Sequence, residues 1–398
     1  MDQGQRLRQT DPEVGDGTDE RLREEETAQL ITFDNVTKKY PDGTVAVDDL
    51  TLEVPEGTLT VFVGPSGCGK TTSMRMINRM IDPTSGTLTV DGNDVTKVDP
   101  VKLRLGIGYV IQSAGLMPHL RVIDNVATVP VLRGESRRSA RKAALAVMER
   151  VGLDPKLGDR YPAQLSGGQQ QRVGVARALA ADPPILLMDE PFSAVDPVVR
   201  EDLQTEILRL QGELRKTIVF VTHDIDEAIK LGDKVAVFGR GGALLQYADP
   251  AFVLSNPANE LVSAFVGADR GYRGLQFFHA TGLALHEVRH VAEGELDALT
   301  LGPDEWALVT KDDRTPIAWI NADGVEAHRK GSALYDSTVG GGSFFRPDGT
   351  LRLALDAALS SPTGLGVAVD DDGRLIGGVR ADDVLALLTE QRRIPEVG

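Results

Sequence analysis

The segment Gly64-Pro65-Ser66-Gly67-Cys68-Gly69-Lys70-Thr71 constrains the fold of this chain more than any other. It matches the pattern G-x-x-x-x-G-K-[ST] in full, follows the apolar run 59–63 and precedes a helical pattern over 71–80. Glycines in such a loop let the backbone wrap a phosphate group, and the start of the following helix adds the positive end of its dipole. The segment therefore predicts a strand, a phosphate-binding loop and a helix.

Apolar runs and helical patterns alternate along the first part of the chain. The runs cover 59–63, 185–188 and 218–221, and the helical patterns cover 71–80, 169–180, 200–214 and 225–231. Continuous apolar runs of this length suit strands that are buried on both faces of a parallel sheet. Strands that alternate with helices predict an α/β fold with right-handed crossovers.

Two acidic residues, Asp189 and Glu190, follow the apolar run 185–188. In P-loop enzymes Lys of the loop neutralises phosphate charge, Thr or Ser offers a hydroxyl to Mg²⁺, and an Asp at a strand end holds the metal. We therefore expect Lys70 on the phosphates, and Thr71 and Asp189 at the metal. Glu190 is expected to act as the base that polarises the attacking water.

A second phosphate-binding helix start is predicted at Leu165-Ser166-Gly167-Gly168-Gln169. A hydroxyl and unpaired backbone N–H groups at the start of a helix favour an anion. The first loop already serves the one nucleotide of the chain, so the second start implies a partner. The helical pattern 137–151 lies between the two, which predicts an inserted helical subdomain at about 112–175.

The run Leu-Ser-Gly-Gly-Gln just before an acidic strand resembles the ABC ATPase family, in which this element contacts ATP held by the opposite protomer. The resemblance covers about 29–247 and implies a P-loop NTPase of the ABC type, ATP hydrolysis with Mg²⁺, and a homodimer. Tyr40 resembles the aromatic residue that stacks on adenine. The implied nucleotide-binding residues are Tyr40, Gly64, Pro65, Ser66, Gly67, Cys68, Gly69, Lys70, Thr71, Thr72, Ser166, Gly167, Gly168 and Gln169.

Three further elements of the family follow in order. Gln112 resembles the glutamine that contacts Mg²⁺ and the water, the segment 193–196 resembles the D-loop, and His223 resembles the histidine that senses the γ-phosphate. The resemblance thus implies Glu190, His223 and Gln112 as catalytic residues. It implies Thr71, Gln112 and Asp189 as metal ligands.

Three segments, 76–80, 112–119 and 192–197, resemble ATPases that power uptake of glycine betaine, carnitine, choline or proline. Such subunits work at the cytoplasmic face of the cell membrane through integral membrane permease subunits, and indirectly with an extracytoplasmic solute-binding protein. An importer of another small solute such as amino acids is one alternative. A soluble ABC ATPase of translation or DNA repair is another, although it predicts two fused cassettes or a long coiled-coil insertion.

Composition limits the partners that this chain can have. Its 398 residues have a formal net charge of -16, which argues against a nucleic-acid partner because such proteins present a basic face. We find no run of about 18 apolar residues, so a membrane role is expected through a partner. Residues 1–28 are acidic and lack periodicity, which predicts a disordered tail.

The C-terminal part is predicted to be a smaller α+β domain. A helical linker is expected over 248–272. Within 273–394, two strand–turn–strand units at 306–320 and 365–379 suggest a divergent tandem repeat. The pair resembles tandem cystathionine-β-synthase (CBS) domains, which bind adenine nucleotides or cyclic di-AMP or sense ionic strength. A dimerisation module without a ligand is the alternative.

One short match points to different chemistry. The segment 286–290 is His-Glu-Val-Arg-His, the H-E-x-x-H pattern that places two imidazoles on one helix face in zinc peptidases. No third ligand is recognisable, and Leu283, Leu285 and Val288 are suited to ordinary packing. We therefore expect a structural role for this segment.

Overall fold

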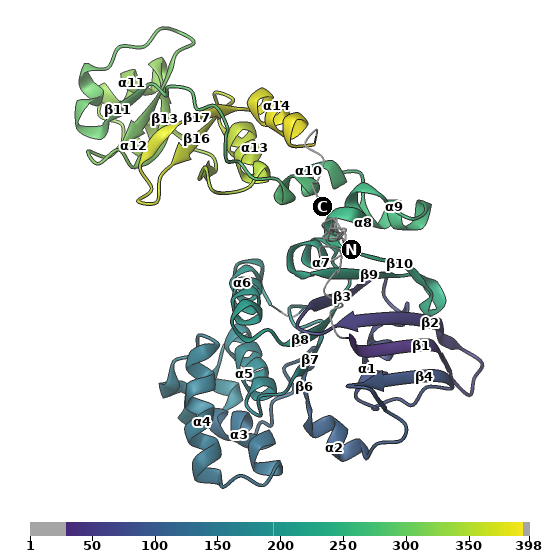
Figure 1. The fold of residues 1–398 in the computed structure, drawn as a ribbon. Helices are drawn as coiled ribbons and strands as arrows, with labels where there is room; N and C mark the ends of the chain where they lie inside the picture. The colour runs from purple at the N-terminus through teal and green to yellow at the C-terminus, as the bar shows by residue number, and fades with distance from the viewer. Residues whose placement is uncertain (1–28, 194, 393–398) are drawn as a thin grey trace, which may run out of the picture. The chain divides into compact units, whose positions relative to one another are not determined.

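The computed structural model describes residues 29–193 and 195–392, so the predicted tail 1–28, Ala194 and residues 393–398 lie outside the described part. The described residues fall into two compact units. The first contains 29–60, 67–221 and 240–243, and the second contains 61–66, 222–239 and 244–392 (Figure 1).

An antiparallel four-stranded sheet forms one part of the first unit. Its order is β2-β1-β4-β5. The strands are β1 (Gln29–Lys39), β2 (Val45–Pro55), β4 (Ser85–Val90) and β5 (Asn93–Asp94). Buried and exposed residues alternate in β2, as expected for a sheet with one face on the core.

Strands that are buried on both faces form the other part of this unit. Strands β6 (Ile107–Val110), β7 (Ile185–Asp189) and β8 (Thr217–Thr222) pair in parallel. Every residue of β7, β8 and β3 (Leu59–Val63) is buried. The predicted strands and their two-sided burial are confirmed.

Helix α1 (Lys70–Ile77) ends earlier than expected. The sequence predicted a helix over 71–80, and that end is wrong by three residues. Arg79 adopts a left-handed backbone with φ 53°, and the Oδ1 atom of Asn78 accepts a hydrogen bond from the Met80 N–H. Asparagine side chains compete for backbone groups in this way and favour turns over helix interiors.

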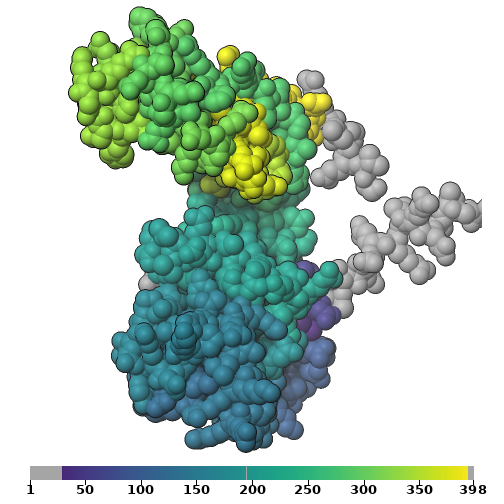
Figure 2. All heavy atoms as spheres, turned by 90° about the vertical axis from the view of Figure 1, so that its left-hand side faces the viewer, coloured from purple at the N-terminus to yellow at the C-terminus, as the bar shows by residue number. Residues whose placement is uncertain are grey.

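A helical subdomain follows the parallel strand β6. Its helices are α3 (Val122–Leu132), α4 (Arg137–Arg150) and α5 (Gly167–Leu179), with short helices η1 (Pro155–Asp159) and η2 (Pro162–Gln164); the short α2 (Pro100–Leu105) precedes β6. Helix α4 buries only Ala140, Ala144 and Met148, a stripe with a spacing of four residues. One narrow stripe packs a surface helix and leaves its other faces in water. Figure 2 shows this helical region from outside in blue and dark teal.

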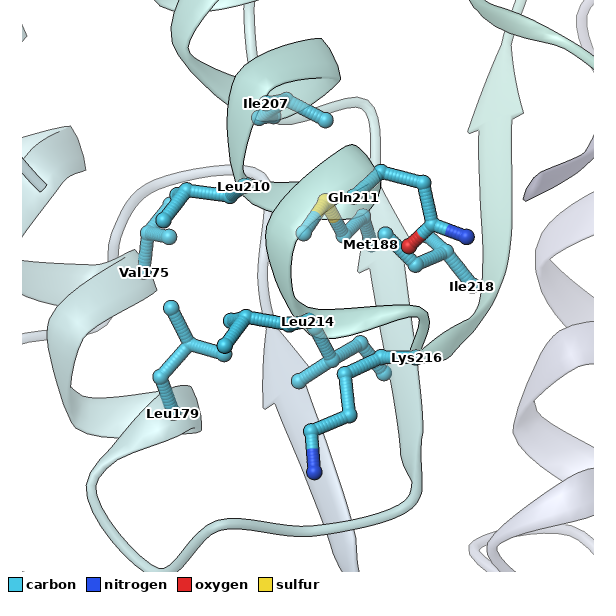
Figure 3. Close-up of a pocket in the computed structure, with 10 residues that line it drawn as sticks. Val175, Leu179, Met188, Ile207, Leu210, Gln211, Leu214, Lys216 and Ile218 are labelled. Atoms are coloured by element: carbon cyan, nitrogen blue, oxygen red, sulfur yellow. The ribbon is translucent and has the colours of Figure 1, made fainter. Parts of the chain in front are cut away.

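Helices α5 and α6 (Pro197–Leu214) pack on β7 and β8 through apolar side chains. Figure 3 shows these side chains pointing toward one another around a cavity of about 10 Å³. Such a space holds roughly one water molecule, so it is a packing defect of the core and no ligand site.

The second unit begins with the elements after β8 and continues into the predicted linker. These elements are α7 (Ile225–Leu231), β9 (Lys234–Phe238), β10 (Leu244–Ala248), α8 (Pro250–Ser255), α9 (Glu260–Val266), α10 (Arg270–Gly274) and η4 (Leu275–Phe277); η3 (Arg240–Gly242) belongs to the first unit. Arg273 of α10 is largely buried and forms an ion pair of 2.7 Å with Asp226 of α7. This pair joins the linker helices to the segment that follows His223.

Two copies of one supersecondary unit make up the rest of the chain. Each copy has a short strand, a helix, two antiparallel strands and a helix. The first is β11 (His290–Ala292), η5 (Glu293–Ala298), β12 (Trp306–Thr310), β13 (Pro316–Asn321) and α11 (Ala322–Arg329). The second is β15 (Phe344–Phe345), α13 (Leu351–Ser360), β16 (Leu365–Val369), β17 (Leu375–Arg380) and α14 (Ala381–Gln391), and α12 (Leu334–Ser337) and β14 (Val339–Gly340) connect the two.

The strand pairing is the same in both copies. The short strand is parallel to the next one, and the two long strands form an antiparallel hairpin. Strands β12 and β16 begin at Trp306 and Leu365, 59 residues apart. Side chains from both hairpins, including Leu308, Trp319 and Val367, form one buried cluster. The predicted tandem repeat is therefore present and has a shared core.

The segment 286–290 is not helical. His286 forms an antiparallel bridge with Gly378, and His290 begins β11. The Nε2 atom of His286 lies 2.8 Å from Asp383 Oδ2 at the start of α14. The two imidazoles therefore do not sit one helical turn apart, as the zinc pattern would require.

Among the described residues we find no helix that is both long enough and apolar enough to cross a membrane.

The shared cluster of the repeats gives a stability prediction. Leu308 is fully buried in it, so Leu308→Ala should lower the free energy of unfolding of this part by about 2–5 kcal/mol, because it leaves a cavity. Tryptophan fluorescence in urea measures this directly, since the two tryptophans of the chain, Trp306 and Trp319, lie on β12 and β13. The control Leu359→Ala removes a side chain that is 66% exposed and should cost less than about 0.5 kcal/mol. Equal losses in the two variants would contradict the shared core.

Candidate functional site

The glycine-rich loop between β3 and α1 adopts a backbone that only glycine tolerates. Gly67 and Gly69 have φ of 78° and 100°, and Gly64 has φ of 152°. A Cβ atom on Gly69 would lie 2.1 Å from the carbonyl oxygen of Ala46. Glycine is thus required at position 69 both by the backbone angle and by the close approach of β2.

The centre of the loop is exposed and its end is buried. Pro65, Ser66 and Gly67 are exposed, whereas Cys68 is buried. Lys70 is only 5% exposed, and its Nζ lies 3.7 Å from Cys68 Sγ. The ammonium group is therefore held within the loop, at the start of α1.

Thr71 and Asp189 meet although 118 residues separate them. The Thr71 hydroxyl donates a 2.9 Å hydrogen bond to Asp189 Oδ1. Thr71 lies in the first turn of α1, and Asp189 is the buried last residue of β7. The structure thus brings together two of the three predicted metal ligands.

Two residues that the sequence analysis did not identify also contact Asp189. Nη2 of Arg75 and the hydroxyl of Tyr109 each lie 3.4 Å from Oδ2. The hydrogen bond to Tyr109, together with the charge of Asp189, raises the pKa of the Arg75 guanidinium, and burial raises the pKa of the Tyr109 hydroxyl. Arg75 lies four residues after Thr71 on the same helix, a spacing that could have indicated it.

Glu190 has an unusual backbone. Its φ is 43°, in the left-handed region that a non-glycine residue enters at a cost of about 1–2 kcal/mol. Three hydrogen bonds fix this conformation: the Glu190 N–H donates to the Val221 carbonyl, and the Glu190 carbonyl accepts from the N–H and the hydroxyl of Ser193. The Nε2 atom of Gln112 lies 3.4 Å from Glu190 Oε2, so these two predicted residues are also brought together.

The second predicted phosphate-binding start forms a capping box. Ser166 Oγ accepts from the Gln169 N–H at 3.3 Å, and Gln169 Oε1 accepts from the Ser166 N–H at 3.0 Å. The serine oxygen acts as an acceptor here, so the hydroxyl proton can still be donated to an anion. Gly167 is exposed and Gly168 half-buried in the first turn of α5, where backbone N–H groups have no partner within the helix.

Tyr40 lies in the turn between β1 and β2, with the Lys38 ammonium 5.3 Å from the centre of its ring. His223 is exposed, directly after β8, and belongs to the second unit. Of the predicted D-loop, Ala194 lies outside the described residues, and Asp196 caps α6 through the Val199 N–H.

The residues present fit Mg²⁺ and a nucleotide. Hydroxyl, carboxylate and amide oxygens are the hard ligands that Mg²⁺ prefers, and Thr71, Asp189 and Gln112 supply one of each. The left-handed loop and the close approach at Gly69 leave the backbone N–H groups able to face a phosphate. This arrangement can bind a nucleoside triphosphate. It also places the Glu190 carboxylate next to the Gln112 amide, where the two can activate a water molecule.

Comparisons with known proteins find a family model and relatives that match this chain. The family model described as ABC transporter matches residues 47–193. The chain is 39% identical over 363 residues to the choline transport ATP-binding protein OpuBA of Bacillus subtilis, covering 87% of this chain and 93% of that protein. It is 40% identical over 376 residues to the osmoprotectant import ATP-binding protein OsmV of Salmonella typhimurium, covering 91% and 97%.

One solved structure has a similar fold over part of the chain. It is an ATP-binding cassette determined as a dimer in a post-hydrolysis state bound to ADP and Pi. The TM-score is 0.52 at 34% sequence identity, over 56% of this chain and 99% of that one.

The loop geometry gives a binding prediction. Gly69→Ala should weaken binding of a fluorescent ATP analogue by at least about tenfold, because Ala prefers a negative φ and its Cβ would clash with Ala46. Gly212→Ala, where a Cβ has open space on α6, is the matched control and should leave binding unchanged. An unchanged affinity in the Gly69 variant would show that the loop does not require this backbone to bind nucleotide.

Proposed function

The chain belongs to the ABC transporter ATP-binding protein family, and on this basis we propose that it hydrolyses ATP to power import of quaternary-amine osmoprotectants. The observation that supports this proposal most directly is the meeting of Thr71 with Asp189 and of Gln112 with Glu190. These contacts unite the metal-binding and water-activating groups that phosphoryl transfer needs.

Nucleotide binding is assigned to the loop 64–72 and to Tyr40. Backbone N–H groups of the loop hold the phosphates, and Lys70 supplies a fixed positive charge that is largely shielded from water. The ring of Tyr40 stacks on adenine, with Lys38 near the ring. Because Gly69 has no side chain, the backbone of β2 at Ala46 can lie close to this part of the loop.

Thr71, Asp189 and Gln112 would hold Mg²⁺, which when bound neutralises phosphate charge and orients the terminal phosphate. Glu190 accepts the proton of the attacking water at its carboxylate, and Gln112, whose Nε2 lies 3.4 Å from Glu190 Oε2, orients the same water. His223, directly after β8, hydrogen-bonds the γ-phosphate. The left-handed backbone of Glu190 fixes the direction in which its side chain leaves β7.

A second copy of the chain completes each site. The capped start of α5, with Ser166, Gly167, Gly168 and Gln169, binds the γ-phosphate held by the partner. Two ATP molecules then join two protomers, and closure excludes water from the reacting groups. Hydrolysis removes the group that joins the halves, so they separate, and this motion drives transport.

The solute class is inferred from the relatives. The two proteins described above are named for choline transport and osmoprotectant import, and both align over most of their length. We infer that integral membrane permease subunits hold this chain at the cytoplasmic face of the membrane. An extracytoplasmic solute-binding protein is the indirect partner that would select the solute.

The C-terminal repeats are proposed to be a divergent CBS pair that regulates the ATPase. The two copies share a strand–helix–strand–strand–helix order and one buried cluster, as a paired sensor module requires. An adenine nucleotide or cyclic di-AMP is the proposed ligand class, with ionic strength as the other signal. We propose that the ion pair between Arg273 and Asp226 couples this module to the segment that follows His223.

The shared site gives a first test. Glu190→Gln should lower ATP turnover by about a hundredfold or more while ATP binding persists, so ATP should trap a closed dimer. Size-exclusion chromatography with light scattering measures the dimer. Adding Ser166→Arg to this variant should abolish the dimer, whereas Ser136→Arg, at the cap of α4 outside the site, should not. A dimer that survives Ser166→Arg would contradict a site shared between protomers.

The solute class is tested in proteoliposomes that contain this chain, its permease and the solute-binding protein. ATP-driven uptake of labelled glycine betaine, choline or carnitine is expected, and preferential uptake of an amino acid would instead establish the alternative importer. If the C-terminal repeats sense ionic strength or a nucleotide, Leu308→Ala should keep basal uptake and lose the response to that signal. An intact response in a variant whose repeats are unfolded would remove the sensing role.

A further inference from the structure

The carboxylate of Asp189 is held from both sides. Its Oδ1 accepts from the Thr71 hydroxyl at 2.9 Å, while its Oδ2 faces the Arg75 guanidinium at 3.4 Å. Thr71 and Arg75 lie four residues apart on α1, so one face of the helix supplies both contacts. The two oxygens therefore have separate partners.

A third contact comes from the neighbouring strand. Tyr109 lies on β6, which pairs in parallel with β7, and its hydroxyl is 3.4 Å from Oδ2. The Arg75 guanidinium reaches the same carboxylate oxygen from α1, also at 3.4 Å. Arg75 and Tyr109 therefore form one unit around Oδ2, built from a helix and a strand that are distant in the sequence.

The two sides of the carboxylate are not equivalent. The Thr71 hydroxyl is the group proposed to bind Mg²⁺, and a lone pair of its oxygen would face the cation while its proton is still donated to Oδ1. The contacts at Oδ2 involve no proposed metal ligand and can persist. The Asp189 side chain is 6% exposed, so water cannot readily replace a lost partner.

We propose that Arg75 and Tyr109 are positioning residues, which hold Oδ2 of Asp189 so that Oδ1 stays directed at the metal position beside Thr71. This inference rests on the Mg²⁺–ATP site proposed above and adds two residues to it. In this proposal Arg75 acts through Asp189 and is given no direct role toward the nucleotide or the attacking water. Outer partners of this kind set the direction of a metal-binding carboxylate.

The positioning role and a simple charge effect predict opposite changes in Mg²⁺ affinity when Arg75 is replaced. Arg75 places a positive charge beside a site for a divalent cation, so loss of that charge alone would strengthen Mg²⁺ binding. Loss of positioning would weaken it, because Asp189 would adopt other side-chain rotamers. The direction of the change therefore separates the two explanations.

The test measures how Mg²⁺ alters nucleotide affinity, using a fluorescent, non-hydrolysable ATP analogue on the full chain. For each variant the dissociation constant is determined in EDTA and across a series of Mg²⁺ concentrations. Arg75→Met should raise the Mg²⁺ concentration for half-maximal tightening by about tenfold, while the constant in EDTA changes less than about twofold. Tyr109→Phe should produce a smaller increase, and Arg75→Lys should restore part of the loss because its ammonium group can still donate a hydrogen bond to Oδ2.

The Arg141–Asp124 pair on the helical subdomain provides the matched control. It is an arginine–aspartate contact of 2.7 Å away from Asp189, so Arg141→Met should leave both constants unchanged. An unchanged or lower Mg²⁺ requirement in Arg75→Met would overturn the positioning role. An equal loss of affinity in EDTA would do the same, since it would reveal general damage to the loop.

The outcome is distinguishable from failure of the proposed function. A wild-type chain whose nucleotide affinity ignores Mg²⁺ would overturn the metal site and this role together. A Glu190→Gln variant that fails to trap a dimer would instead remove only the base or the shared site, because the Mg²⁺ titration does not depend on turnover.

Discussion

The hydrogen bond between Thr71 and Asp189 joins the two elements on which the rest of the site depends. It fixes the start of α1 against the end of β7. The loop residues 67–70 and the Glu190 side chain are therefore held in fixed positions relative to each other. Arg75 reaches the same carboxylate because it lies one turn further along α1. Gln112 reaches Glu190 because β6 and β7 run parallel and end at the same edge. These contacts between distant segments bring together the groups proposed for nucleotide binding, metal coordination and water activation.

What the sequence could predict was local. The loop 64–71, the strands 59–63 and 185–188 and the capped start of α5 depend on neighbouring residues, and the structure contains all of them. The contact of Tyr109 depends on which strand lies beside β7, which no local pattern contains, whereas the spacing of Arg75 from Thr71 on α1 could have indicated Arg75. The backbone of Glu190 was equally hidden, because its left-handed angle is imposed by Val221 and Ser193. The assigned roles of these residues remain proposals.

The C-terminal repeats show the same division. Their long hairpins, at 306–320 and 365–379, were predicted from apolar strands around acidic turns, and both are present. The short strands β11 and β15 and the helices between were missed. Residues 293–298 contain Gly294 and Asp297, which have low helix propensity, and they form a 3₁₀ helix where the second copy has α13. The two copies therefore differ most at the helix after the short strand, where the helix propensity of the first copy is low. The cluster shared by the two hairpins is nevertheless present.

The capping box of Ser166 and Gln169 has a consequence for how strongly two protomers can associate. Both side chains already satisfy the backbone at the start of α5, so this turn is formed before any phosphate arrives. Association usually loses free energy because loops and side chains must become ordered at the new interface. At this helix start that ordering is complete when the chain folds. In the proposed shared site, more of the attraction between a phosphate and this helix end would therefore hold two protomers together.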